Sequence, residues 1–230
     1  MIVYGRNPVR EALRGPRRVR RVWASESAGR LPWLGSVPVE RTDAVRLAEL
    51  AGSGEHQGVC AEVDPYAYAD AEGLLAEPEA LVVALDQVQD PHNLGAVARV
   101  AEAAGAAGLV LPERRAAEVT PAVCRASAGA VEHLSVARVR NLADWLRGAK
   151  AAGAWAYGAA RAGEPYERFD YGGRAVLVLG SEGAGLRPRV ASTCDAIVAL
   201  PMHGRVESLN VSTAAAALLY GILQLRARRA

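Results

Sequence analysis

The sequence predicts an α/β fold in which a mostly parallel sheet of about six strands follows a smaller mixed unit. Candidate strands and helices alternate from Leu81 onward, and several of the strands are continuous apolar runs. Such runs are typical of strands buried on both faces of a parallel sheet. The chain has 230 residues, which at about 150 residues per domain allows one large domain or two unequal ones.

The first 63 residues predict the smaller unit. Asn7 is expected to cap a helix that has Pro8 at its first position and runs to Arg14, where a Gly-Pro pair ends it. Residues 64–80 carry no sustained apolar period and are expected to link the two units. The other elements expected here are a strand over Val19–Ala24, a helix that Thr42 caps and that ends near Gly52, and a strand over 58–63.

The larger unit is expected to alternate strands with helices, and its ligands should bind in the loops beyond the carboxyl ends of the strands. Candidate strands lie at Leu81–Leu85, Gly108–Leu111, Leu134–Val139, Ala154–Ala159, Ala175–Leu179 and Ala196–Leu200. Helical patterns lie at Leu94–Ala104, Pro121–Ala128, Leu142–Ala152, Pro188–Thr193 and Asn210–Arg226.

Composition excludes several classes of protein. Apolar residues make up 51% of the chain and charged residues 23%, which is ordinary globular usage and excludes a disordered chain. No apolar run approaches the roughly 18 residues that span a membrane, and the first residues lack the pattern of a signal peptide. Three widely spaced cysteines and four histidines without metal-ligand spacing predict a cytoplasmic protein with no disulfide framework and no metal.

The net charge of +2 points to no partner, but the basic residues are unevenly placed. Residues 6–21 hold seven arginines against a single acid, Glu11. Such a segment can bind the phosphate groups of a nucleic acid, and it is equally typical of a solvated surface.

Two loops of the larger unit carry candidate site residues. The loop after Leu81–Leu85 leads to Asn93, Gly95 and Arg99. Asn93 suits a helix N-cap, and a spacing of six residues lets Asn93 and Arg99 both reach the mouth of one cleft. A capped helix with a surface arginine would give the same pattern. The loop after Ala175–Leu179 has three glycines around Glu182 at spacings that do not fit the dinucleotide fingerprint, so it indicates either a ligand without phosphates or an ordinary turn.

A third loop follows Ala196–Leu200 and runs from Pro201 to Ser212, directly into the last helix. A cap by Ser208 or Asn210 would explain one polar residue of the Ser-Leu-Asn-Val-Ser string and leave the others without a role. Each loop alone is a modest signal, whereas the order of all three along the chain is specific.

In this order the three loops resemble those of the SpoU/TrmH family of S-adenosylmethionine-dependent RNA 2′-O-ribose methyltransferases, which belongs to the SPOUT class. The N-x-G-x-x-x-R motif matches Asn93, Gly95 and Arg99; the G-x-E-G-x-G motif matches Gly180, Glu182, Gly183 and Gly185; and the P-M-x-G-x-x-x-S-L-N-V-S motif matches Pro201 through Ser212. The strings at 4–9 and 56–59 resemble an RNA-binding extension related to ribosomal protein L30e. The two-domain layout most resembles the RlmB-type enzymes that methylate a guanosine of 23S ribosomal RNA.

The resemblance implies a fold and a division of the chain. The fold would be a SPOUT-type parallel sheet with a C-terminal trefoil knot, an exception to the usual connection rules, together with a small N-terminal L30e-like α/β domain. Residues 1–70 would bind the RNA substrate, 71–80 would be a linker, and 81–230 would be the catalytic domain. Family members are homodimers whose active sites combine residues of both subunits. The last helix could form that interface or lie in the core.

The resemblance also implies roles for individual residues. In the family Arg99 is proposed to help deprotonate the ribose hydroxyl; because arginine is a very weak base, the alternative is that it clamps the phosphate and polarises the hydroxyl. The other catalytic positions implied are Asn93, Glu182, Ser208 and Asn210. The residues implied to bind S-adenosylmethionine are Leu179, Gly180, Gly185, Leu200, Met202, Ser208 and Leu209. The residues implied to bind RNA are Arg6, Asn7, Arg10, Arg17, Arg18, Arg20, His56 and Gln57.

Two rival functions stay open at this point. Transfer RNA is the alternative substrate for the same chemistry. A non-catalytic RNA-binding factor in ribosome assembly would keep the fold, but it predicts damaged motifs, whereas Arg99, Glu182 and Asn210 are all present.

Overall fold

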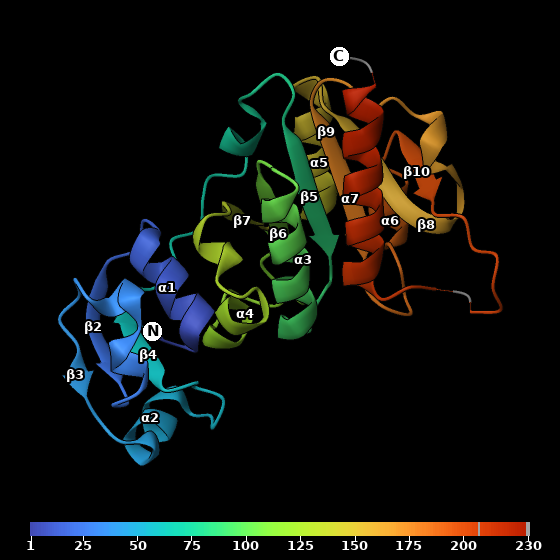
Figure 1. Ribbon diagram of the computed structural model, residues 1–230. Coiled ribbons are helices and arrows are strands. Elements are labelled where there is room, and N and C mark those ends of the chain that lie inside the picture. The colour runs from blue at the N-terminus through green and yellow to red at the C-terminus, as the bar shows by residue number, and fades with distance from the viewer. Residues whose placement is uncertain (207, 229–230) are drawn as a thin grey trace.

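The computed structural model describes residues 1–206 and 208–228, so residue 207 and the last two residues of the predicted catalytic domain lie outside the described part. It contains two sheets (Figure 1). A four-stranded sheet of order β1-β4-β2-β3 occupies the N-terminal part, and a six-stranded sheet of order β10-β8-β9-β5-β6-β7 occupies the rest. The chain therefore divides into a smaller and a larger α/β unit, in the predicted order.

The smaller unit has one more strand at each edge than the sequence predicted. β4 pairs antiparallel with both β1 and β2, and β3 extends the sheet by a two-residue pairing with β2. The two additional strands are too short for a period of two to show in the sequence. The elements are β1 (Ile2–Tyr4), α1 (Arg6–Arg14), β2 (Val19–Ala24), the short turns η1 (Ala28–Arg30) and η2 (Pro32–Leu34), β3 (Glu40–Arg41), α2 (Ala44–Ala51) and β4 (Val59–Val63).

The predicted caps of both helices in this unit are wrong. Gly5 precedes α1 with a φ of 93° and without a side-chain cap, and Asn7 lies inside the first turn. Asp43, not Thr42, caps α2, because its carboxylate accepts a hydrogen bond of 2.8 Å from the backbone N–H of Arg46. Both errors come from several capping residue types standing side by side, where sequence cannot choose among them.

All six predicted strands of the larger unit are present, and all pair in parallel. β8 continues well past its predicted end at Ala159, to Pro165. The strands are β5 (Leu81–Asp86), β6 (Gly108–Pro112), β7 (Val136–Val139), β8 (Trp155–Pro165), β9 (Ala175–Gly180) and β10 (Ala196–Ala199). The helices are α3 (Pro91–Ala103), α4 (Pro121–Ala126), α5 (Leu142–Ala151), α6 (Pro188–Ala191) and α7 (Val211–Ala227), with short turns η3 (Gly73–Leu75), η4 (Ala130–Glu132) and η5 (Tyr166–Arg168).

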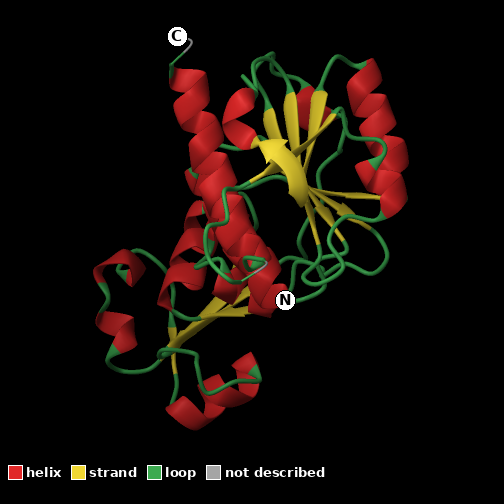
Figure 2. Cartoon of the chain, turned by 90° about the vertical axis from the view of Figure 1, so that its right-hand side faces the viewer, coloured by secondary structure: helices red, strands yellow, loops and turns green. Residues whose placement is uncertain are grey.

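Helices cover both faces of the six-stranded sheet (Figures 1 and 2). Along β5, Leu81, Val83 and Leu85 pack in a core with α3 and α7, whereas Val82 and Ala84 pack with α5 and α6. This alternation explains why the strand reads as one continuous apolar run. α7 buries Ala215, Leu218, Leu219 and Ile222, so the last helix contributes one face to the core.

The segment expected to be a linker packs against the larger sheet. The Tyr66 hydroxyl donates a hydrogen bond of 2.8 Å to the carbonyl of Leu134, and the Tyr68 hydroxyl accepts one of 3.0 Å from the N–H of Val119. Ala69 forms a parallel bridge with Ala137. The chain between the sheets is thus held on the larger unit by these contacts.

Arg17 joins the two units instead of facing solvent. Its guanidinium forms an ion pair with Glu132 through two hydrogen bonds, one of them 2.7 Å long, and the exposed fractions of the two side chains are 7% and 0%. Burial lowers the pKa of an arginine, but the hydrogen bond and charge of Glu132 outweigh it and raise the pKa of Arg17 above its usual value. The expectation that Arg17 binds RNA is therefore corrected, because a buried and paired guanidinium does not present itself to a phosphate.

Gly95 permits close packing between α3 and α4. A Cβ atom at this position would lie 2.4 Å from the Cβ of Ala126 and 2.9 Å from the backbone nitrogen of Ser127. We expect Gly95→Ala to lower the free energy of unfolding by about 1–3 kcal/mol through overpacking. Thermal melts should show a lower Tm than for Gly148→Ala, a matched helical glycine on α5 with nothing within 4 Å; equal Tm values for the two variants would contradict the packing role.

Candidate functional site

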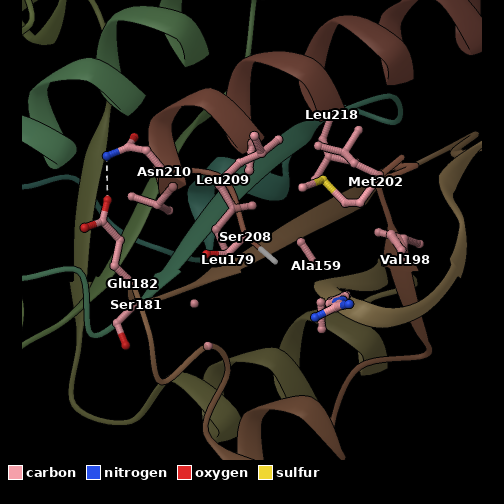
Figure 3. A pocket seen from close by; sticks show the side chains of 18 of the residues that line it. Ala159, Leu179, Ser181, Glu182, Val198, Met202, Ser208, Leu209, Asn210 and Leu218 are labelled. Carbon is pink, nitrogen blue, oxygen red and sulfur yellow. Dashed lines mark hydrogen bonds between the residues drawn. The ribbon is translucent and has the colours of Figure 1, made fainter. Parts of the chain in front are cut away.

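A cavity of about 830 Å³ opens at the carboxyl ends of β9 and β10 and beside residues 159–161 of β8 (Figure 3). The glycine-rich loop after β9 and the loop before α7 form much of its wall. It includes all seven residues that the family resemblance implied for donor binding: Leu179, Gly180, Gly185, Leu200, Met202, Ser208 and Leu209. The volume falls within the range of small-molecule sites, about 300–1,000 Å³.

The glycine-rich loop owes its shape to backbone freedom and close approach. Gly180 ends β9 so near to the returning chain that a Cβ atom there would lie 2.2 Å from the carbonyl carbon of Gly185. Ser181 and Gly185 hydrogen-bond to each other through their backbones, at 2.9 and 3.2 Å, and Gly183 and Gly185 have φ angles of 78° and 66°. Residues with side chains rarely adopt these angles, so this composition is needed for the loop to fold back along the cavity.

Three polar side chains from the three predicted loops meet at one rim of the cavity. The Asn93 amide donates to Glu182 Oε1 at 3.2 Å, and the Asn210 amide donates to Glu182 Oε1 and to Asn93 Oδ1, the latter at 2.8 Å. Figure 3 shows the Asn210–Glu182 bond beside the cavity. Of these three residues, Glu182 and Asn210 line the cavity. Their hydrogen bonds to Asn93 fix them to α3.

The capping roles considered for two of these residues have different outcomes. Asp90, not Asn93, caps α3, because its carboxylate accepts from the N–H of His92. Asn93 is instead free to bind Glu182. Asn210 does cap α7, accepting from the N–H of Ser212 at 2.8 Å. Its side chain therefore orders the helix and the rim of the cavity together.

Arg99 lies apart from this cluster. It is exposed on α3 and does not line the cavity. Six residues of helix place it about 9 Å farther along the axis than Asn93 and on a different face, so the expectation that both side chains reach one cleft does not hold within a single chain. Within residues 1–206 and 208–228 its side chain has no hydrogen bond or ion pair.

The lining of the cavity suits an apolar ligand with a few polar groups and without phosphates. Leu179, Leu200, Met202 and Leu209 offer apolar contacts, and the loop backbones offer amide and carbonyl groups. Among the described residues that line it, Arg161 is the single cation and Glu182 the single carboxylate. An adenosine with a sulfonium side chain matches this set, because it presents an apolar ring, hydroxyl groups and a positive charge.

The residues implied to bind RNA lie on the smaller unit, and their charges are partly compensated. Arg10 and Arg20 pair with Glu11 and Asp64, whereas Arg6, Asn7 and Arg18 are exposed. Gln57 and His56 have local structural roles: the Gln57 side chain accepts from the N–H of Arg6, and His56 Nδ1 accepts from the N–H of Gly58. Arg6, Asn7 and Arg18 are therefore the exposed members of that set for which the structure shows no side-chain partner.

Sequence reasoning missed the pair that joins the end of β5 to the residue before α6, just after the glycine-rich loop. Asp86, fully buried at the end of β5, accepts hydrogen bonds from the backbone and the guanidinium of Arg187 at 2.8 and 2.7 Å. A charged residue that closes a wholly apolar strand was the signal available, since buried carboxylates require a partner. In the described part of the chain no helix is both long and apolar enough to cross a membrane.

Two family models match the chain. Residues 80–220 match the SpoU rRNA Methylase family, and residues 2–69 match a model described as RNA 2′-O ribose methyltransferase substrate binding. YacO of Bacillus subtilis, provisionally named a TrmH family tRNA/rRNA methyltransferase, is 38% identical over 97% of this chain and 95% of its own length. An uncharacterized tRNA/rRNA methyltransferase of Synechocystis is 36% identical over 98% of this chain, which spans 62% of that relative.

Solved structures agree with this assignment. The SpoU methyltransferase AviRb from Streptomyces viridochromogenes, in complex with the cofactor AdoMet, superposes with a TM-score of 0.83 at 29% identity, covering 100% of this chain and 91% of that one. An AdoMet-bound rRNA methyltransferase from Sinorhizobium meliloti gives 0.82 at 27% identity, covering 97% and 86%. Matches of this extent show that the chain belongs to the SpoU rRNA methylase family.

Proposed function

We propose that this protein transfers a methyl group from S-adenosylmethionine to a ribose 2′-hydroxyl of RNA, on a guanosine of 23S ribosomal RNA. The observation that carries the proposal is the cavity at the ends of β9 and β10, whose rim holds the Asn93–Glu182–Asn210 cluster. Two relatives of this fold are described as bound to AdoMet, which supports the choice of donor. The match of residues 2–69 to a substrate-binding model supports the choice of a ribose in RNA.

The chain's own residues divide the work of binding and orientation. Leu179, Leu200, Met202 and Leu209 would hold the adenine, and the backbone of the glycine-rich loop would bind the polar groups. When bound, S-adenosylmethionine supplies an activated methyl group. The Asn93–Glu182–Asn210 cluster keeps both loops in register with α3, so that the ribose hydroxyl meets a preformed site.

The finer features of the fold belong to the same proposal. A trefoil knot would lie at the carboxyl end of the larger unit, and the smaller unit would be an L30e-like domain. We propose a homodimer because Arg99 does not line the cavity of its own chain, so a site that uses Arg99 would take it from a second subunit. Exposed apolar residues near the start of α7 and on its outer face support this: Val206, Leu209 and Tyr220 are 70%, 41% and 48% exposed.

Ribosomal RNA is the proposed substrate and transfer RNA the alternative, with the enzyme in the cytoplasm where both occur. The decisive experiment incubates the protein and labelled S-adenosylmethionine with separate pools of unmodified 23S, 16S and transfer RNA, then maps the modified ribose. We expect label in 2′-O-methylguanosine of 23S RNA. Label in transfer RNA alone would favour the alternative, and donor binding without transfer to any pool would indicate a non-catalytic RNA-binding factor.

Glu182 tests the role of the cluster. We expect Glu182→Ala to reduce methyl transfer by about 10–100-fold, because two amides lose their shared charged acceptor, worth about 1.5–3 kcal/mol. Single-turnover transfer to 23S RNA measures the effect. Glu167→Gln, an exposed glutamate on η5 away from the cavity, should keep wild-type rates; comparable losses in both variants would argue against a specific role for Glu182.

A further inference from the structure

A second cavity, of about 270 Å³, lies at the same edge of the larger sheet. Its residues follow the carboxyl ends of three neighbouring strands: Gln87 follows β5, Arg114 and Arg115 follow β6, and Arg140 follows β7. Because all six strands are parallel, these ends lie at one edge together with those of β8, β9 and β10. In Figure 1, β6 and β7 lie to one side of β5 and β8 and β10 to the other. The donor cavity and this arginine cavity therefore flank β5.

The arginine cavity carries an uncompensated positive charge. Of its four arginines, Arg187 alone is paired, with Asp86. Arg114, Arg115 and Arg140 are exposed and have no ion pair with any residue that the structure describes. Four guanidinium groups less one carboxylate leave a charge of +3 in a small concavity. Like charges gathered in this way repel one another, so the arrangement favours an anion.

The backbone of this cavity is held in an unusual conformation. Gln87 and Arg115 have φ angles of 62° and 58°. Residues with a side chain rarely adopt such angles, and they concentrate at ligand-binding positions, where the surrounding structure must hold them. Asn141, which caps α5 at the same cavity, places the positive end of that helix there as well.

We infer that the arginine cavity binds a backbone phosphate of the substrate RNA, beside the nucleotide whose ribose reaches the donor cavity. Planar guanidinium groups bind phosphate oxygens through two parallel hydrogen bonds, and phosphate contacts set the register of a nucleic acid strand. Adjacent strands of a sheet lie about 4.8 Å apart, so β6 is roughly 10 Å from β9. That separation suits a phosphate close in sequence to the methylated nucleotide. This inference rests on the proposed function.

The test compares two double variants with the same loss of charge. Arg114→Gln/Arg140→Gln removes two guanidinium groups and leaves Arg115 and the ion pair of Arg187 with Asp86 intact. The control, Arg147→Gln/Arg189→Gln, removes two exposed arginines of α5 and α6 that pair with Asp144 outside the cavity. Binding of 23S RNA is measured over a range of KCl concentrations without donor, and S-adenosylmethionine affinity is measured by calorimetry.

We expect the cavity variant to bind RNA about tenfold more weakly at fixed salt, and the slope of log K against log[KCl] to fall by about 0.7–0.9 per lost phosphate contact. Donor affinity should stay within twofold of wild type. An RNA affinity and slope equal to those of the control would overturn the inference. The inference would also be overturned if guanosine monophosphate or inorganic phosphate bound tightly through these arginines and RNA binding did not depend on them. The cavity would then bind a free anion.

Failure of the proposed function gives a different result. Because RNA binding is measured without donor, a wild-type protein that binds RNA with the expected salt dependence but transfers no methyl group would contradict the proposed reaction alone. A cavity variant with unchanged RNA binding and normal transfer by the wild type would contradict the phosphate site alone.

Discussion

Arg99→Lys should lose methyl transfer to RNA by about 10²–10³-fold, the usual cost of removing one group that stabilises charge in a transition state. Both possible roles of Arg99 need a guanidinium: a lysine presents a compact charge in place of a planar fork, and it does not reproduce a two-point grip on a phosphate. Donor affinity should stay within twofold, because Arg99 does not line the donor cavity. Single-turnover transfer and calorimetry measure the two quantities.

Arg168→Lys is the matched control, since Arg168 is an exposed arginine of the same unit that pairs with Glu164. Transfer by Arg99→Lys at the rate of this control would refute both roles of Arg99. A large fall in donor affinity would instead place Arg99 in the donor cavity, against the geometry of the single chain.

Mixing two inactive variants decides whether Arg99 acts across a dimer. In a shared site, the donor cavity of an Arg99→Lys chain meets the intact Arg99 of a Glu182→Ala chain and forms one complete site. Random exchange of subunits should then restore about a quarter of the wild-type sites. If Arg99 served the cavity of its own chain, no complete site would form and the mixture would stay at the activity of the weaker variants.

The larger sheet could be predicted from sequence because its signal is local. β5 is apolar up to Leu85 and β9 up to Leu179, and each of these residues is buried whichever helix covers it. The meeting of Asn93, Glu182 and Asn210 also followed, since parallel strands bring their loops to one edge. What linked the three positions was the resemblance to the family, because their separations of 89 and 28 residues along the chain carry no local signal.

The details that could not be predicted depend on contacts between distant residues. Arg17 and Arg18 are adjacent in a basic segment, and composition treats them alike. In the structure Arg18 is exposed, whereas Arg17 pairs with Glu132, 115 residues away. Glu132 lies in η4, a single turn, so nothing around it in the sequence indicates a buried carboxylate. The same limit hid Asp86 and Arg187, which are 101 residues apart.

Arg17→Met should destabilise the protein by about 3–5 kcal/mol, because it leaves the fully buried Glu132 carboxylate without its cation. The cost of one uncompensated buried charge is a large part of the 5–15 kcal/mol by which domains are stable. Chemical denaturation followed by tryptophan fluorescence measures it. Arg20→Met is the matched control, since Arg20 stands three residues later and its ion pair with Asp64 is exposed; its unfolding midpoint should stay close to wild type.

The double variant Arg17→Met/Glu132→Leu separates an unpaired charge from a lost contact. Removing both charges replaces a buried ion pair by apolar side chains, which is often neutral or stabilising, so we expect it to recover most of the stability that Arg17→Met loses. If it does not, the hydrogen bonds that Arg17 makes to the carbonyl of Asp64 and to Cys124 account for the lost stability instead. RNA binding by the double variant then tests whether Arg17 itself contacts RNA. Because Arg17 is buried, its loss should leave the salt dependence of RNA binding unchanged once the fold is restored, whereas loss of the exposed Arg18 should reduce it.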